Sequence, residues 1–95
     1  MKITNIESLI VDAGWRPWGF VKVETDEGVT GWGECSDGRS PMGVSGTIED
    51  LKPILIGSDP REFETRFWDM LRATRQSPGG IAAKAIAGLD CAFID

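Results

Sequence analysis

Hydrophobic and polar residues alternate along the first third of the chain, which predicts strands there. Residues 2–12 are rich in β-branched side chains and end before a glycine, as an opening strand would. Their alternation is irregular, so we expect a β-bulge in this strand or burial of both its faces. Residues 20–26 alternate strictly, which predicts a second strand with one buried face. That face carries Val21, Val23 and Thr25.

A tight turn and a third strand follow. The sequence Asp-Glu-Gly at residues 26–28 turns the chain, with the glycine at positive φ. Residues 29–34 then return as the third strand. Gly31 and Gly33 flank Trp32 here, and glycine inside a strand is typical of a bulge or of close approach by another backbone. We expect the large Trp32 side chain to lie in the core.

Helical spacing replaces alternation after a polar loop. Ser40 and Pro41 have the form of a helix N-cap and first helical position, and this first helix closes at Gly57. Asp59 and Glu62 have the spacing of a capping box, which predicts the start of a second helix. The first helix is expected to bury Val44, Ile48, Leu51 and Leu55. The second is expected to bury Phe63, Phe67, Leu71 and Thr74, with Trp68 beside them in the core.

A third helix is predicted over residues 81–94, with an apolar face of mostly small side chains that indicates close packing against another element. The helical pattern still runs at Asp95, so we expect the chain to be cut inside a larger protein. Without its partner domain, this face should form an exposed patch and leave the chain marginally stable. The elements together predict the α+β class: a three-stranded antiparallel meander followed by a helical bundle.

Composition narrows the chemistry that the chain can perform. Its 95 residues suit one small domain, residues 1–95, and are far fewer than the roughly 250 of a (β/α)₈ barrel. The net charge of −5 and the scattered basic residues argue against a nucleic-acid partner. The chain has no histidine, which excludes Ser–His and Cys–His nucleophile pairs within it.

The compartment is inferred from the cysteines and the apolar runs. The two cysteines, Cys35 and Cys91, lie far apart, and the N-terminus lacks the apolar region of a secretory signal. No run approaches the roughly 18 apolar residues of a membrane helix. We therefore expect reduced thiols, a cytoplasmic protein and no membrane partner.

Four segments in order carry a specific resemblance. They are residues 1–7, the hairpin from Lys22 to Glu34, the stretch from Leu51 to Pro60, and residues 85–95. Together they resemble the N-terminal capping domain of the enolase superfamily, in its mandelate racemase and muconate lactonizing branch. The resemblance implies a lid over a modified (β/α)₈ barrel, with the last helix, about residues 79–95, leading into that barrel domain.

The resemblance also implies a reaction and a cofactor. Members abstract the proton α to a carboxylate, and Mg²⁺ stabilises the resulting enediolate. The metal ligands and catalytic bases are expected in the barrel, so this chain is assigned no catalytic and no metal-binding residue. A small-molecule carboxylate substrate, the barrel domain and further copies of the chain are the expected partners. An acid-sugar dehydratase is the main hypothesis. The alternatives are a racemase or epimerase, a cycloisomerase, or a non-catalytic α+β module for binding or oligomerisation.

Two loops are expected to select the substrate's distal end, residues 13–19 and residues 35–43. The candidate substrate-binding residues on them are Trp15, Arg16, Trp18, Arg39 and Ser40. The arginines suit an anionic or polar group, and the tryptophans would exclude water. Structural roles are the alternatives: either tryptophan could pack against the helices, Ser40 could be only a helix cap, and Arg39 only a solvated charge.

Overall fold

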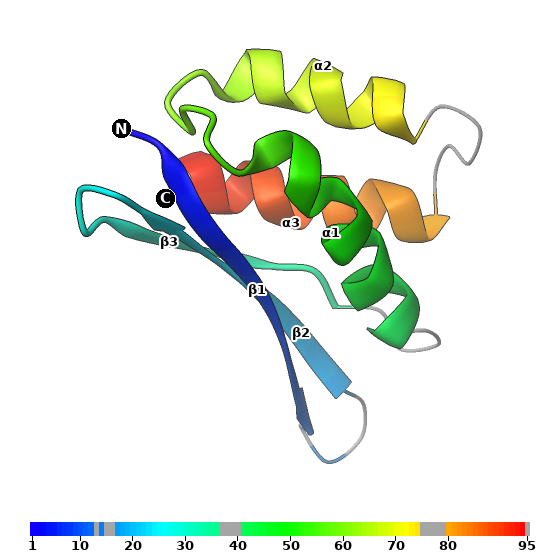
Figure 1. The fold of residues 1–95 in the computed structure, drawn as a ribbon. Coiled ribbons are helices and arrows are strands. Elements are labelled where there is room, and N and C mark those ends of the chain that lie inside the picture. The colour runs from blue at the N-terminus through cyan, green and yellow to red at the C-terminus, as the bar shows by residue number, and fades with distance from the viewer. Residues whose placement is uncertain (13, 15–16, 37–40, 75–79, 95) are drawn as a thin grey trace.

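The protein folds as a three-stranded sheet with three helices on one of its faces (Figure 1). The structure is a computed structural model that describes residues 1–12, 14, 17–36, 41–74 and 80–94. The predicted α+β order is confirmed. Its elements are β1 (Ile3–Asp12), β2 (Pro17–Thr25), β3 (Thr30–Glu34), α1 (Pro41–Leu55), α2 (Phe63–Ala73) and α3 (Gly80–Ile94).

The sheet is an antiparallel meander in the order β1-β2-β3. A register shift between Ile3 and Asn5 confirms the predicted irregularity of the first strand. The turn between β2 and β3 has Gly28 at φ 76°, as predicted. One boundary was wrong: β2 begins at Pro17, because Trp18 and the residues after it already pair with β1. The first predicted loop is therefore shorter than residues 13–19.

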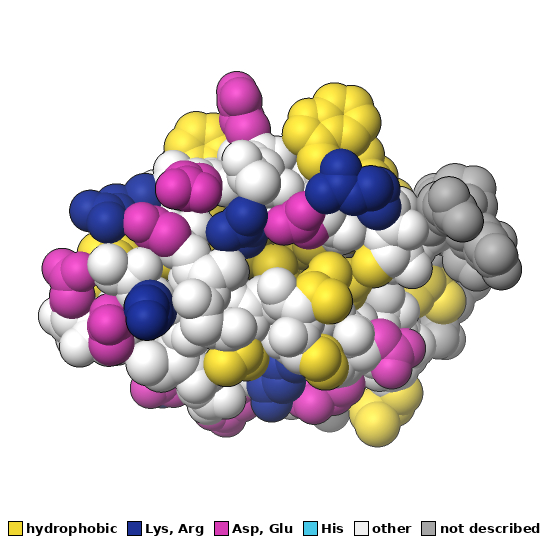
Figure 2. All heavy atoms as spheres, turned by 45° about the horizontal axis from the view of Figure 1, so that its top comes forward, with side chains coloured by type: hydrophobic (Ala, Val, Ile, Leu, Met, Phe, Trp, Pro, Cys, Tyr) yellow, Lys and Arg dark blue, Asp and Glu magenta, His cyan; other side chains and the backbone are white. Residues whose placement is uncertain are grey.

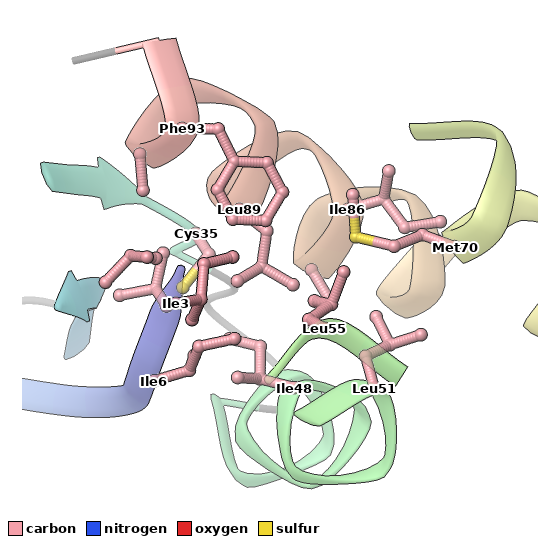
Figure 3. Close-up of a cluster of buried hydrophobic side chains, with 14 of the residues drawn as sticks. Ile3, Ile6, Cys35, Ile48, Leu51, Leu55, Met70, Ile86, Leu89 and Phe93 are labelled. Carbon is pink, nitrogen blue, oxygen red and sulfur yellow. The ribbon is translucent and has the colours of Figure 1, made fainter. Parts of the chain in front are cut away.

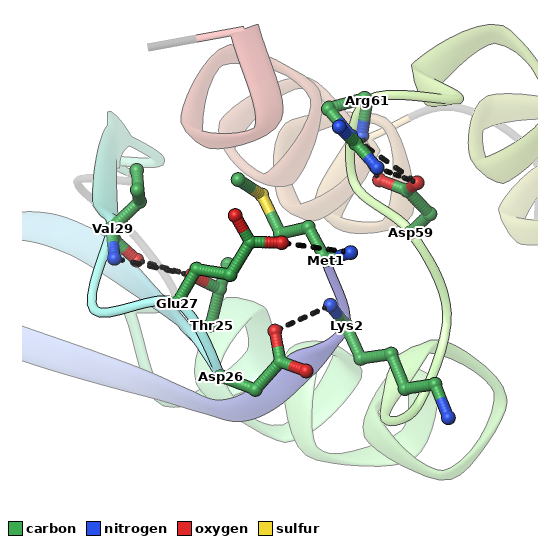
Figure 4. Close-up of polar contacts among 8 residues, drawn as sticks. All are labelled: Met1, Lys2, Thr25, Asp26, Glu27, Val29, Asp59 and Arg61. Atoms are coloured by element: carbon green, nitrogen blue, oxygen red, sulfur yellow. Dashed lines mark hydrogen bonds and ion pairs between the residues drawn. The ribbon is translucent and has the colours of Figure 1, made fainter.

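Polar contacts hold the N-terminal end of the sheet (Figure 4). The amino group of Met1 pairs with Glu27 at 3.0 Å, and the Lys2 amide donates to Asp26 Oδ1 at 2.9 Å. The last turn of α3 lies at the same end, since Met1 and Ile94 line one cavity. This places the β2–β3 turn beside both chain ends, and the β1–β2 connection at the opposite end of the sheet (Figure 1).

The first helix follows its predicted pattern. Its four expected core residues are between 0 and 2% exposed. Figure 3 shows three of them, Ile48, Leu51 and Leu55, in the buried cluster. The helix continues two residues beyond Pro53. Gly57 then takes φ 88°, which suits a glycine that closes a helix.

The second helix departs from prediction at its start and on its buried face. It begins at Phe63, with Glu62 as its N-cap. Asp59 accepts the Arg61 amide at 2.9 Å and binds the Arg61 guanidinium, but the residues from Asp59 to Glu62 form a separate turn that does not continue into the helix. Phe63 is 38% exposed, whereas Met70, which was not predicted, is fully buried. Phe67 and Leu71 pack against the core as expected, so the error lies in Phe63 and in the omission of Met70.

Close backbone packing joins α3 to β3, as the glycines in the third strand predicted. A Cβ atom added to Gly31 would overlap the Ala92 carbonyl oxygen, and one added to Gly33 would overlap that of Gly88. The apolar face of α3 is thereby buried inside the domain, with Leu89 0% exposed. The expectation that this face forms an exposed patch was therefore wrong.

Both tryptophans that were expected in the core are exposed. Trp32 is 46% exposed, because Gly31 and Gly33 occupy the inward positions of β3 and leave Trp32 on the other face of the sheet. There the Lys22 ammonium lies 5.7 Å from the Trp32 ring centroid. Trp68 is 59% exposed, and hydrophobic side chains stand out among the charged ones over α2 (Figure 2).

Two further expectations concern the thiols and the membrane. Cys35 and Cys91 are both free, as predicted. Across the described parts of the chain, no helix combines the length and the apolar character that a bilayer crossing requires.

Candidate functional site

The two candidate loops leave the sheet at the end away from the chain termini. One joins β1 to β2 between Asp12 and Pro17, and the other joins β3 to α1 between Glu34 and Pro41 (Figure 1). Of the five candidate residues, only Trp18 belongs to the described part of the chain. The other four, Trp15, Arg16, Arg39 and Ser40, lie outside the described residues.

Trp18 lies where β2 begins, opposite Val11 of β1. Its side chain is 41% exposed and meets the Phe20 ring edge-on, with 6.3 Å between ring centroids. Trp18 and Phe20 alternate with the buried Val21, so they belong to the sheet face that turns away from the helices. The alternative that Trp18 packs against the helices is therefore wrong.

Two hydrogen bonds join the bases of the two loops, and a third supports them. The Cys35 amide donates to the Gly19 carbonyl at 2.9 Å, and the Gly19 amide donates to Ser36 Oγ at 3.1 Å. Ser36 Oγ donates in turn to Glu34 Oε2 at 2.6 Å. Both backbone polar groups of Gly19 are thus held by the segment that follows β3. We call Gly19, Glu34, Cys35 and Ser36 the loop-base cluster.

Cys35 anchors this cluster to α3. Its side chain is 6% exposed, and a Cβ added to Gly88 would lie 2.7 Å from that of Cys35. Burial, and then the adjacent Glu34 carboxylate, raise the pKa of the Cys35 thiol. A neutral, buried thiol is a poor nucleophile, so Cys35 is a packing residue here.

A hollow of about 270 Å³ opens beside the loop-base cluster. It is lined by Glu34, Ser36 and Lys84, together with Cys35 and Ala87. Carboxylate, hydroxyl and ammonium groups suit hydrogen bonding to a polar ligand. The lining has no histidine, and its carboxylate, Glu34, accepts the hydrogen bond of the Ser36 hydroxyl at 2.6 Å.

The described residues do not fit a magnesium site. Among residues 1–12, 14, 17–36, 41–74 and 80–94, no three acidic, cysteine or histidine side chains gather where they could hold a metal ion. One acidic residue of α2 pairs with arginines instead: Asp69 binds Arg66 at 3.1 Å and also binds Arg72.

Sequence reasoning placed Gly19 in the first loop and Cys35 and Ser36 in the second, but it did not bring these residues together. Gly19 and Ser36 are 17 residues apart and share no motif. The available signal was the hairpin register: Phe20 pairs with Glu34, so the next pair outward is Gly19 with Cys35. Extending the predicted hairpin by one pair would have brought these residues together.

Known proteins resemble the chain over its whole length. A D-galactonate dehydratase from Ralstonia pickettii (strain 12J) is 42% identical over 96 residues, which are all of this chain and 24% of that protein. A proposed L-alanine-DL-glutamate epimerase from Burkholderia xenovorans strain LB400, solved with magnesium and fumarate, is 36% identical. It matches 98% of this chain and 23% of that chain with a TM-score of 0.91. The chain therefore spans about a quarter of the length of these relatives.

A third solved structure extends the range of activities. The 3,6-anhydro-D-galactonate cycloisomerase from Zobellia galactanivorans is 26% identical, with a TM-score of 0.93 over 100% of this chain and 28% of that one. The family model described as the mandelate racemase / muconate lactonizing enzyme N-terminal domain matches residues 11–95. These matches confirm the resemblance drawn from the hairpin and its flanking segments. The chain belongs to the mandelate racemase / muconate lactonizing enzyme family of the enolase superfamily, as its N-terminal domain.

Proposed function

We propose that this domain is the substrate-selecting lid of a magnesium-dependent enzyme that abstracts the proton α to a carboxylate, and that the enzyme dehydrates an acid sugar. The observation that carries the proposal is the 42% identity, along all of this chain, to a D-galactonate dehydratase. The work that we propose for this domain is recognition of the substrate and exclusion of water from the closed site.

Each loop has a proposed share in recognition. Arg16 and Arg39 would hydrogen-bond the polar distal end of the substrate, and Ser40 would bind one of its hydroxyls. Trp15 and Trp18 would form an apolar wall that keeps water out of the closed site. The exposed position of Trp18 beside the first loop supports this role, because its ring is not committed to the core.

The remaining parts of the enzyme are proposed to lie in a barrel domain. It would provide the magnesium ligands and the bases that move the α proton. A bound Mg²⁺ would stabilise the enediolate formed when that proton leaves. We place the enzyme in the cytoplasm, in keeping with its two free cysteines, and propose that it forms a homo-oligomer.

The test is a screen of the full-length protein against acid sugars with magnesium present. A dehydratase removes water from a 2,3-dihydroxy acid and yields a 2-keto-3-deoxy product. We expect such a product from at least one galactonate-like acid. A second candidate, an epimerase, is favoured by the 36% identity to the Burkholderia structure, and would invert a stereocentre without loss of water. A screen in which no acid sugar is dehydrated would refute the main proposal.

Substitutions then test the assignment of Arg16. Arg16→Ala should lower kcat/KM by about 10- to 100-fold, because a hydrogen bond to a charged group contributes about 1.5–3 kcal/mol. Stability should stay within about 0.5 kcal/mol of the parent. Arg72→Ala is the matched control, since its side chain is 70% exposed on α2, away from both loops. Equal kcat/KM values for both variants would show that Arg16 does not contact the substrate.

A further inference from the structure

We infer that Ser36 is a positioning residue: its hydroxyl ties the start of β2 to the end of β3 and thereby sets the place of Trp18 and of the sheet ends from which the two loops leave. The kinetic consequence of this inference rests on the proposed function. The hydrogen-bonding role of Ser36 does not rest on the proposed function, because it concerns contacts within the described residues.

β2 and β3 separate at Gly19 and Cys35, where the regular pairing of their backbones ends. Two residues directly opposite each other in a hydrogen-bonded antiparallel pair normally exchange two backbone hydrogen bonds. Gly19 and Cys35 make only one of them, from the Cys35 amide to the Gly19 carbonyl at 2.9 Å. The Gly19 amide instead donates to Ser36 Oγ at 3.1 Å. The serine side chain thus replaces a backbone acceptor where the chain leaves the sheet.

The orientation of the Ser36 hydroxyl is fixed on both sides. A hydroxyl has one proton to donate, and that of Ser36 goes to Glu34 Oε2 at 2.6 Å. Its lone pairs then face the Gly19 amide, which can only donate. Because Ser36 Oγ donates one hydrogen bond and accepts the other, each bond polarises the hydroxyl and strengthens the other bond.

Packing prevents the cluster from adjusting freely. Gly19 is buried, and a Cβ added to it would lie 3.2 Å from the Cys35 carbonyl oxygen, which is tighter than an ordinary contact. Cys35 is pressed against Gly88 of α3 on its other side. A change in the Ser36 segment is therefore transmitted to Gly19, and Trp18 is the residue that precedes it.

The experiment uses the full-length protein and four variants. In Ser36→Ala, we expect the Gly19 amide to exchange with solvent about 10-fold faster, because its acceptor is lost. KM for the acid sugar should rise about 3- to 10-fold, with kcat changed by less than about 2-fold, as expected when binding alone is weakened. Ser36→Thr keeps the hydroxyl and should restore both values.

Ser58→Ala is the matched control. Its hydroxyl also donates one part-buried hydrogen bond, to the Leu55 carbonyl, but at the end of the domain near Ile3. It should leave Gly19 exchange and KM unchanged. Arg16→Ala, measured beside these variants, tests the proposed function separately. It should raise KM without altering Gly19 exchange.

The outcomes separate the positioning role of Ser36 from the proposed substrate-binding role of Arg16. Unchanged Gly19 exchange in Ser36→Ala overturns the inference, and so does a KM equal to that of Ser58→Ala. A Ser36→Thr variant as impaired as Ser36→Ala also overturns it, because the hydroxyl would then not be the cause. If Arg16→Ala leaves KM unchanged while Ser36→Ala alters both readouts, the proposed role of Arg16 fails and the positioning role of Ser36 is supported.

Discussion

Replacing Gly33 by alanine tests the packing on which the whole domain depends. Gly33 lies on the inner face of β3, where α3 crosses the sheet (Figure 1). A Cβ there would overlap the Gly88 carbonyl oxygen and would also lie 3.0 Å from the Gly88 carbonyl carbon and 3.1 Å from the Ala92 nitrogen. All three atoms belong to helix backbone. No side-chain rotation can relieve the clash, so the helix must move away from the sheet.

The cost follows from what that movement disrupts. Overpacking a core typically costs 1–3 kcal/mol, and this case should reach or exceed about 3 kcal/mol because backbone must shift. Leu89 and Ile86 of α3 lie in the same core as α1 and α2, so their contacts would loosen together (Figure 3). For a domain of this size, such a loss corresponds to a fall in Tm of about 12–24 °C.

Gly46→Ala is the matched control for this experiment. Gly46 is exposed in the interior of α1, and nothing lies within 4 Å of a Cβ placed on it. The same substitution should therefore raise stability there, by about 0.5–1 kcal/mol, because alanine is the better helix former. Urea unfolding followed by circular dichroism measures both variants. If Gly33→Ala unfolds within about 0.5 kcal/mol of the parent, the close packing of β3 and α3 described above is wrong.

Three further predictions concern exposure and titration. Trp32→Ala should cost less than about 1 kcal/mol in urea unfolding, because the ring is 46% exposed and its cation–π contact is at the surface; a loss above about 3 kcal/mol would mean that the ring is buried. Hydrogen bonds from Arg61 lower the pKa of Asp59 from 3.8 to about 2. The contribution of ionised Asp59 to stability is thus complete above about pH 4 and is lost as the pH falls through about 2. Asp59→Asn should therefore flatten that part of the stability–pH curve, and an unchanged slope would contradict this. Exposed Cys91 should react with a thiol reagent at pH 7.5 well before buried Cys35, as peptide mass spectrometry would show, and equal rates would contradict the burial of Cys35.

Turns and helix ends that are marked by a glycine could be predicted from the sequence. The turn at Gly28 and the end of α1 at Gly57 both require positive φ, and both were located correctly. The start of α2 was not, although Asp59 has the spacing of a capping residue. Its carboxylate satisfies the nearby Arg61 guanidinium, an alternative that spacing alone does not reveal.

The tryptophans show why residue size is a weaker guide than strand parity. Trp32 was expected in the core because large aromatic residues are usually buried. Yet Gly31 and Gly33 had already been recognised as sites of close backbone approach, and residues on either side of them in a strand must point the other way. Applying both facts together places Trp32 outside, where it lies beside Lys22.

The candidate site combines residues that a local pattern describes poorly. Gly19 is buried because β2 extends past the predicted loop boundary, and Cys35 is buried because α3 lacks a side chain at Gly88. Neither the extension of β2 nor the lack of a side chain at Gly88 can be recognised from the sequence immediately around Gly19 or Cys35. Small residues at these crossings let strands and helix meet at backbone distance, which gives the two loops a rigid base. Under the proposed function, the loop residues set substrate preference and the base only holds them, so Ser36 and Gly19 should tolerate less change than Arg16 or Arg39.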